Sequence, residues 1–210
     1  MKKSLSFLLF SLLITFLVSN TSLAQSVMIG PRITGNYTVY NEQNDVNSWN
    51  GIGVGIGGTV DISFTPHIGI LADLTVFDMR NFSTSITQQN TTTEFSYALS
   101  YLSLDPMFKA EFSGFYMVGG PSVGIKLAGS GQVTQTNVGQ TPVITNLNKP
   151  FNSVRFDIVV GTGYNFTLTP TLALGTDFMV YIPLSNTFNF PGISNSTLTL
   201  KLGAAIKFGL

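Results

Sequence analysis

The stretch from Gly51 to Phe64 reads GIGVGIGGTVDISF, and its side chains alternate in character from one residue to the next. The even positions are apolar, with Gly58 as the one exception, and the odd positions are small or polar. The single charge in the stretch is Asp61, at an odd position. Because successive side chains of a β-strand point to opposite faces of a sheet, the stretch predicts a strand with one apolar and one polar face.

The same alternation recurs towards both ends of the chain, and no segment after the first two dozen residues has helical periodicity. At the C-terminus, the leucines, Ile206 and Phe208 alternate with Thr199, Lys201 and Lys207. The pattern predicts eight strands, near residues 29–39, 51–64, 68–79, 95–109, 115–127, 153–168, 172–183 and 198–210.

The lengths of the strands and connections predict a membrane barrel. Most of the expected strands have 12 to 16 residues, whereas a tilted strand needs roughly 9 to 11 to cross the hydrocarbon core of a bilayer. Short connections at 65–67, 110–114 and 169–171 alternate with long, polar ones at 41–50, 80–94, 128–152 and 184–195. This arrangement is typical of bacterial outer-membrane proteins. We therefore expect an all-β fold, an eight-stranded antiparallel up-and-down transmembrane β-barrel in the cell outer membrane.

Aromatic residues and composition favour a membrane barrel over a soluble, ligand-binding one. Five phenylalanines stand near the strand ends on the side of the short connections, and Tyr37, Phe156 and Phe178 stand towards the other strand ends. Two such groups are expected at the two membrane interfaces. In a soluble barrel, the polar face would be the solvated exterior, but charged residues are only 10% of this chain and the polar face is rich in glycine.

The first 24 residues have the pattern of a secretory signal peptide. Lys2 and Lys3 precede an apolar run from Leu5 to Val18, and small residues before Gln25 predict cleavage between Ala24 and Gln25. The run is shorter than the roughly 20 residues of a membrane-spanning helix. We expect residues 1–24 to be the signal peptide and 25–210 the barrel domain.

One expected strand does not alternate regularly. Its apolar residues stand at odd positions up to Tyr101 and at even positions from Leu102 onward. Either a β-bulge absorbs this change of phase, or some of the aromatic side chains fill the barrel interior.

The polar faces carry most of the charged residues, which we expect to form a network inside the barrel. An eight-stranded barrel is just wide enough for side chains to fill it, and buried charges must be paired. Balanced charge favours a closed lumen over an ion or proton path. The predicted interior set is Arg32, Asp61, Asp73, Asp105, Lys109, Lys126, Arg155, Asp157, Asp177, Lys201 and Lys207.

The sequence contains no recognisable catalytic, metal or cofactor motif. Cysteine is absent, and the lone histidine, His67, follows Pro66 in a short connection. Neither a nucleophile with its base nor a zinc site is expected from this set. The glycine-rich stretch lacks the lysine and helix of a phosphate-binding loop. We expect no enzyme activity, no cofactor and no nucleic acid partner.

Two neighbouring strands resemble the PorT-like outer-membrane β-barrel family. The segment Tyr101–Lys109, YLSLDPMFK, is similar to that family's mid-barrel strand, and YMVGGPSVG at Tyr116–Gly124 is similar to its next strand. The chain departs from the family at two places. Ser103 stands where the family usually has glutamate, and two residues follow Phe208, whereas members of the family often end on an aromatic residue. The resemblance implies eight antiparallel strands and, for some members, a link to protein secretion.

Three functions remain open at this stage. The first is a non-enzymatic surface-binding or envelope-structural role carried by long extracellular loops. The second is an accessory component of a protein secretion apparatus, and the third is a narrow porin-like channel. The expected partners are outer-membrane lipid, the barrel-assembly machinery during insertion, and envelope or secretion proteins.

Overall fold

The structure is a computed structural model, and it describes residues 26–42, 49–147, 151–189 and 194–210. The predicted signal peptide and its Ala24–Gln25 cleavage site lie outside these residues. Among the described residues, no helix has the length and apolar character of a membrane span. The strands are β1 (Ser26–Glu42), β2 (Trp49–Ser63), β3 (Ile68–Gln88), β4 (Thr91–Phe112), β5 (Phe115–Asn137), β6 (Val143–Leu147), β7 (Val154–Thr169), β8 (Leu172–Pro183) and β9 (Asn195–Gly209).

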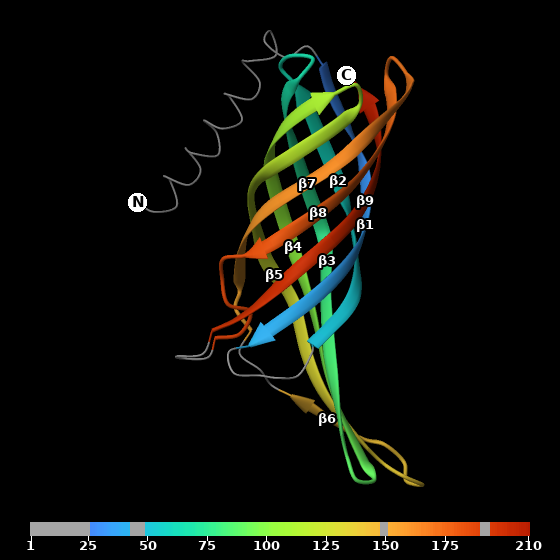
Figure 1. Cartoon of the computed structure of the whole chain (residues 1–210), viewed down its shortest axis with the longest axis vertical. Helices are drawn as coiled ribbons and strands as arrows, with labels where there is room; N and C mark the ends of the chain where they lie inside the picture. Colours follow the sequence, from blue (N-terminus) through green and yellow to red (C-terminus); the bar gives the residue numbers. More distant parts are fainter. Residues whose placement is uncertain (1–25, 43–48, 148–150, 190–193) are drawn as a thin grey trace.

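Eight of these strands close into an antiparallel barrel, which confirms the predicted fold (Figure 1). Each pairs with its neighbours along the chain, and β1 pairs with β9 to close the ring. The short strand β6 pairs only with β5 and takes no part in the ring. The barrel strands are therefore β1 to β5 and β7 to β9.

The three short connections lie at the same end of the barrel as the C-terminus (Figure 1). At the β4–β5 hairpin, Ser113 and Gly114 both have positive φ angles, of 53° and 86°. A two-residue turn with positive φ at both positions matches the twist of the flanking strands, and glycine adopts this conformation without strain. In an outer-membrane barrel this end faces the periplasm, and the opposite end is extracellular.

Two of the predicted long loops are largely strand. β3 and β4 continue through the predicted loop 80–94 and are joined by a turn at Gln89 and Asn90, and β5 continues to Asn137. Beyond the membrane both faces of a strand meet water, so threonine, serine and glutamine replace the apolar residues and the alternation is lost. The predictions of loops at 80–94 and 128–152 are wrong for this reason.

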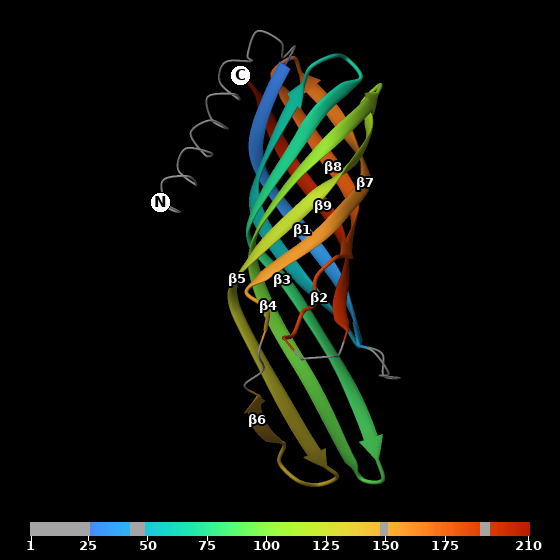
Figure 2. The same ribbon diagram turned by 90° about the vertical axis from the view of Figure 1, so that its left-hand side faces the viewer.

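These continuations form a four-stranded sheet that projects from the extracellular end (Figure 2). We call it the finger and define it as residues 84–95 and 131–147. β2 last pairs with β3 at Asn50 and Ser83, whereas β3, β4, β5 and β6 pair with one another beyond that point. Five residues of β3 past Ser83 correspond to about 17 Å of extended chain.

The apolar residues of the barrel strands face outward, as the alternation predicts. Ile52 is 76% exposed and Phe108 is also 76% exposed at the outer surface. The phenylalanines expected at the periplasmic interface, among them Phe112 and Phe208, are exposed as well. An outer surface of this kind is stable only against lipid.

The irregular strand β4 keeps a single phase. Tyr97, Leu99, Tyr101 and Met107 are all buried, together with the polar residues at odd positions between them. The register shift lies in the pairing with β5, where Leu127 is the extra residue between the partners of Ser100 and Tyr101. Tyr97 and Tyr101 of β4 therefore fill the interior, which is the second of the two alternatives.

Candidate functional site

The interior of the barrel holds twelve buried charged side chains among the described residues, six positive and six negative. They come from β1, β2, β3, β4, β7, β8 and β9, and they form three groups along the barrel. The twelve are Arg32, Asp61, Asp73, Asp78, Arg80, Asp105, Lys109, Arg155, Asp157, Asp177, Lys201 and Lys207.

The first group lies near the periplasmic end. Asp61 accepts hydrogen bonds from Lys109 and from Lys207, whose Nζ is 2.8 Å from Asp61 Oδ2. Lys109 also contacts Glu111 Oε2 at 2.7 Å, and Lys207 donates to Asn165 at 2.9 Å. A hollow of about 390 Å³, lined in part by Asp61 and Lys109, opens at this end. One carboxylate thus holds together two strands, β4 and β9, from different sides of the barrel.

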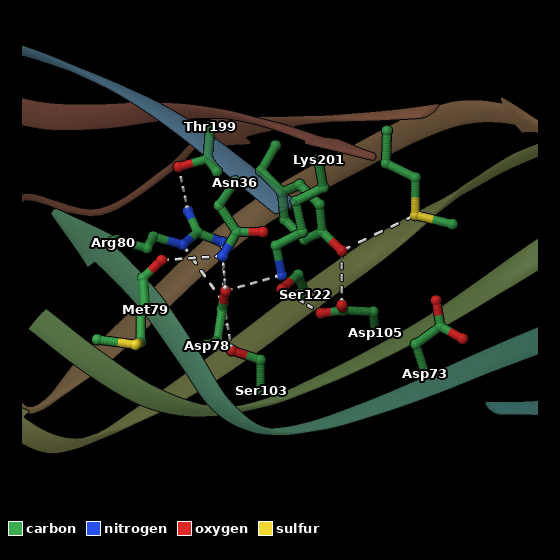
Figure 3. A network of polar contacts seen from close by, with 12 residues as sticks. Asn36, Asp73, Asp78, Met79, Arg80, Ser103, Asp105, Ser122, Thr199 and Lys201 are labelled. Carbon is green, nitrogen blue, oxygen red and sulfur yellow. Dashed lines mark hydrogen bonds and ion pairs between the residues drawn. The ribbon is translucent and has the colours of Figure 1, made fainter. Parts of the chain in front are cut away.

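The second group is centred on Arg32 of β1. Its Nε is 3.3 Å from Asp73 Oδ2, and its Nη2 contacts Asp177 Oδ1. Nearby, Asp105 accepts hydrogen bonds from the hydroxyls of Tyr181, at 2.7 Å, and Ser122. Figure 3 shows Asp73 and Asp105 side by side in this part of the interior.

The third group surrounds Asp78 of β3. Lys201 Nζ lies 3.0 Å from Asp78 Oδ1, and Arg80 Nη2 and Arg155 Nη2 each lie 3.2 Å from Asp78 Oδ2. Neutral donors complete the shell, since Ser103 donates at 2.8 Å and Asn36 at 3.0 Å (Figure 3). One carboxylate is therefore bound by five strands, β1, β3, β4, β7 and β9.

Aromatic rings lie against the cations of these groups. The Tyr181 ring lies 4.2 Å from Lys201 Nζ and 5.0 Å from the guanidinium carbon of Arg80. The Tyr101 ring lies 4.6 Å from the guanidinium carbon of Arg155. Such contacts stabilise desolvated cations, so aromatic rings as well as carboxylates surround the buried cations.

A cluster of seven aromatic residues and two leucines covers the extracellular end of the network. We call it the aromatic cap: Tyr40, Trp49, Phe82, Tyr97, Leu99, Tyr101, Leu147, Phe151 and Phe188. The rings of Tyr40 and Phe82 stack at 4.9 Å, and those of Phe151 and Phe188 stack at 5.0 Å. Phe151 and Phe188 also form a β-bridge, so residues outside the barrel strands close over its mouth.

Ten of the eleven residues predicted for the interior network lie in it. The exception is Lys126, which is only partly buried and donates to the carbonyl of Phe151 at 3.0 Å, next to that residue's ring. It takes no part in the ion pairs described above. Its place is beside the aromatic cap, which the alternation of β5 did not indicate.

Sequence reasoning missed Asp78 and Arg80, two central residues of the network. Both lie beyond a bulge, because β3 places Val76 and Phe77 opposite the single residue Leu102 of β4. The bulge moves the inward face of β3 from odd to even positions. A signal was present, since unbroken alternation would have turned the charge of Asp78 towards lipid, where it is costly.

The chemistry available to this interior is limited. No cluster of three or more histidine, cysteine or acidic residues suited to a metal ion occurs in the described parts of the chain. His67 is exposed in the β2–β3 connection, where it stacks on Phe112 and contacts the carbonyl of Glu111 at 3.1 Å. The interior therefore offers ion pairs and hydrogen bonds that hold the wall together.

The closed ring of long strands, the apolar outer surface and the charged interior together define an integral outer-membrane β-barrel protein. A family model described as the outer membrane protein beta-barrel domain matches residues 16–189. The chain belongs to this family, and the protein lies in the outer membrane.

Several solved structures are similar to this chain. Ail of Yersinia pestis, in complex with the heparin analogue sucrose octasulfate, is 12% identical with a TM-score of 0.40, over 88% of this chain and 100% of Ail. OprG of Pseudomonas aeruginosa is 11% identical with a TM-score of 0.41, over 89% and 95%. CarO2 of Acinetobacter baumannii is 10% identical with a TM-score of 0.45, over 89% and 100%. No curated protein sequence matches the chain.

Proposed function

We propose that this protein is a non-enzymatic surface protein whose closed barrel anchors the finger in the outer membrane, and whose finger binds a partner outside the cell. The observation that carries the proposal is the contrast between the two ends of the molecule. The interior is filled by ion pairs and covered by the aromatic cap. The finger, in contrast, extends three barrel strands into the medium.

The test is to remove the β3–β4 half of the finger, against which β5 pairs, and keep the barrel. In this variant, Asn-Gly replaces residues 85–94, so that Thr84 and Phe95, which are paired in the native sheet, flank a two-residue turn. Cells that produce the variant should lose adherence or envelope integrity relative to cells that produce the native protein. If every surface-binding and envelope phenotype stayed unchanged, the proposal would fail.

A second proposal concerns the PorT-like resemblance. It is supported by the two segments that carry it, Tyr101–Lys109 and Tyr116–Gly124, which are neighbouring strands, with Leu104 opposite Val123 and Phe108 opposite Gly119. Under this proposal the protein is an accessory component of a secretion apparatus. Co-purification of secretion proteins with the tagged, detergent-extracted barrel would support it, and unchanged secretion in a deletion strain would contradict it.

We also propose that residues 1–24 are removed as a signal peptide and that the barrel-assembly machinery inserts the remainder. Amino-terminal sequencing of the membrane-extracted protein should then begin at Gln25. A sequence beginning at Met1 would contradict the cleavage.

A further inference from the structure

The finger is an open sheet, and β6 forms one of its edges. β6 pairs with β5 over its whole length, with Val143 opposite Gln135 at one end and Leu147 opposite Gly131 at the other. Within the described part of the chain, no strand pairs with the other side of β6. An edge strand presents main-chain N–H and C=O groups that another extended chain can bind.

Two apolar side chains of β6 are exposed on opposite faces of the sheet. Val143 is 62% exposed and Ile144 is 63% exposed, and successive residues of a strand point to opposite sides. A partner that docks on one face of the finger covers only one of them. A strand added in the plane of the sheet contacts both.

β6 is only five residues long, which is one usual protection of an edge strand, but it lacks the other protections within its length. Charged side chains, proline and bulges discourage pairing, but residues 131–147 contain no charged residue, and Pro142 precedes the strand. The pairing of β6 with β5 is regular. Without a lysine or arginine, this part of the finger offers no basic side chain to a polyanion.

We propose that the free edge of β6 binds an extended, uncharged segment of a partner polypeptide as an added strand. This inference rests on the proposed surface-binding function and names its partner class. Main-chain hydrogen bonds supply the affinity in this mode of recognition, and alternate side chains supply the specificity.

β6 of a second copy in the same membrane fits the edge poorly. Two such copies point the same way, so their β6 strands are parallel. A two-fold axis along the membrane normal would place identical residues of the two β6 strands opposite each other. In a parallel pair, however, each residue forms its hydrogen bonds with the two residues that flank the one opposite it. The edge therefore suits a strand other than β6 of a second copy.

The experiment uses the full chain in detergent micelles and a fluorescent peptide with the sequence of residues 131–137, GQVTQTN. This segment includes the part of β5 that pairs with the other edge of β6. A second peptide has the same sequence but N-methyl groups on alternate residues, which remove main-chain donors. We expect the unmodified peptide to bind at least about tenfold more tightly, because strand addition depends on main-chain hydrogen bonds.

Two matched variants locate the binding edge. Ile144→Lys places a charge on β6 and should weaken binding of the peptide at least about tenfold. Val138→Lys places the same charge at the tip of the finger, on a residue that is 81% exposed but outside β6. It should leave binding within about twofold, as expected of a surface residue outside the binding edge.

Four results would overturn the proposal. Equal binding of the methylated peptide would exclude main-chain pairing, and this comparison needs only the native protein. Equal binding by Ile144→Lys, folded as judged by heat-modifiable gel mobility, would exclude the β6 edge. A native dimer that Ile144→Lys dissociates would make a second copy the occupant. If Ile144→Lys kept the surface phenotypes that the finger replacement abolishes, the proposed function would stand and the edge would not be its site.

Discussion

At the scale of single residues, Asp78 has the largest number of cationic partners in the interior network. Lys201, Arg80 and Arg155 all lie within 3.2 Å of its carboxylate, and its side chain is fully buried. Removal of one member of a buried ion group leaves the others uncompensated in a medium of low dielectric constant. The stability of the wall near the extracellular end therefore depends on this carboxylate.

We predict that Asp78→Asn lowers the free energy of unfolding by about 3 to 5 kcal/mol, because it leaves three buried cations short of one negative charge. Equilibrium unfolding in urea, with the protein in detergent or lipid, measures the change. The matched control is Glu94→Gln, which removes a carboxylate from an exposed position of the finger. It should change the free energy of unfolding by less than about 0.5 kcal/mol. Equal effects of the two variants would refute the role of Asp78.

Gly53 is required by the close approach of two strands. A Cβ at this position would lie 2.1 Å from the main-chain oxygen of Met79 in β3. On the inward face of the opening stretch, glycine leaves space for other side chains in a narrow lumen. The structure gives an additional reason at Gly53, since here β2 lies directly against the backbone of β3 beside the bulge.

We predict that Gly53→Ala destabilises the barrel by about 1 to 3 kcal/mol, the usual cost of forcing an extra methyl group into a packed site. Gly35→Ala is the matched control, because a Cβ at Gly35 has no atom within 4 Å. Thermal unfolding, followed by the loss of heat-modifiable mobility, should separate the two variants. A Gly53→Ala protein as stable as Gly35→Ala would show that the strands can move apart without cost.

At the scale of the elements, the barrel and the finger are joined by shared strands but stabilised by different neighbours. The barrel part of β3 pairs with both β2 and β4, whereas its last five residues pair only with β4. The ring closes between β1 and β9, and neither of these strands is paired with a strand of the finger. The barrel should therefore not depend on the finger.

We predict that the replacement of residues 85–94 by Asn-Gly leaves the barrel folded, because none of the ring pairings is removed. The variant should show the same shift in gel mobility on heating as the native protein, and its urea midpoint should change little. A variant that stays in the unfolded position without heating would show that the hairpin is needed for folding or insertion.

At the scale of the whole molecule, two barriers in series close the lumen. The ion-pair network fills the interior with buried side chains, and the aromatic cap covers it on the extracellular side. An eight-stranded barrel has no further width for a water-filled channel once its interior is packed. Removal of one barrier leaves the other in place.

We predict that neither the native protein nor Phe188→Ala gives a stable unit conductance in planar bilayers, because the ion-pair network remains in both. The measurement compares each protein with an established porin inserted into the same bilayers. Stable, reproducible conductance from the native protein would contradict the closed interior. Conductance from Phe188→Ala alone would place the whole barrier in the aromatic cap.

The fold and most of the interior network were predictable from the sequence. Strict alternation over long strands fixes which side chains face lipid, and ten of the eleven predicted charges lie in the interior for that reason. The inward face of β3 beyond Thr75 was harder to predict, because a bulge changes it and the charge of Asp78 is the signal that marks the change.

What the sequence by itself determined is the membrane part of the molecule, where lipid on one side and a packed interior on the other impose a two-residue period on every strand. Only the tertiary structure decided the finger and the two central charges, Asp78 and Arg80. Water on both faces of a strand imposes no period, and the register of a bulge is set by the neighbouring strand and not by the residues of the bulge.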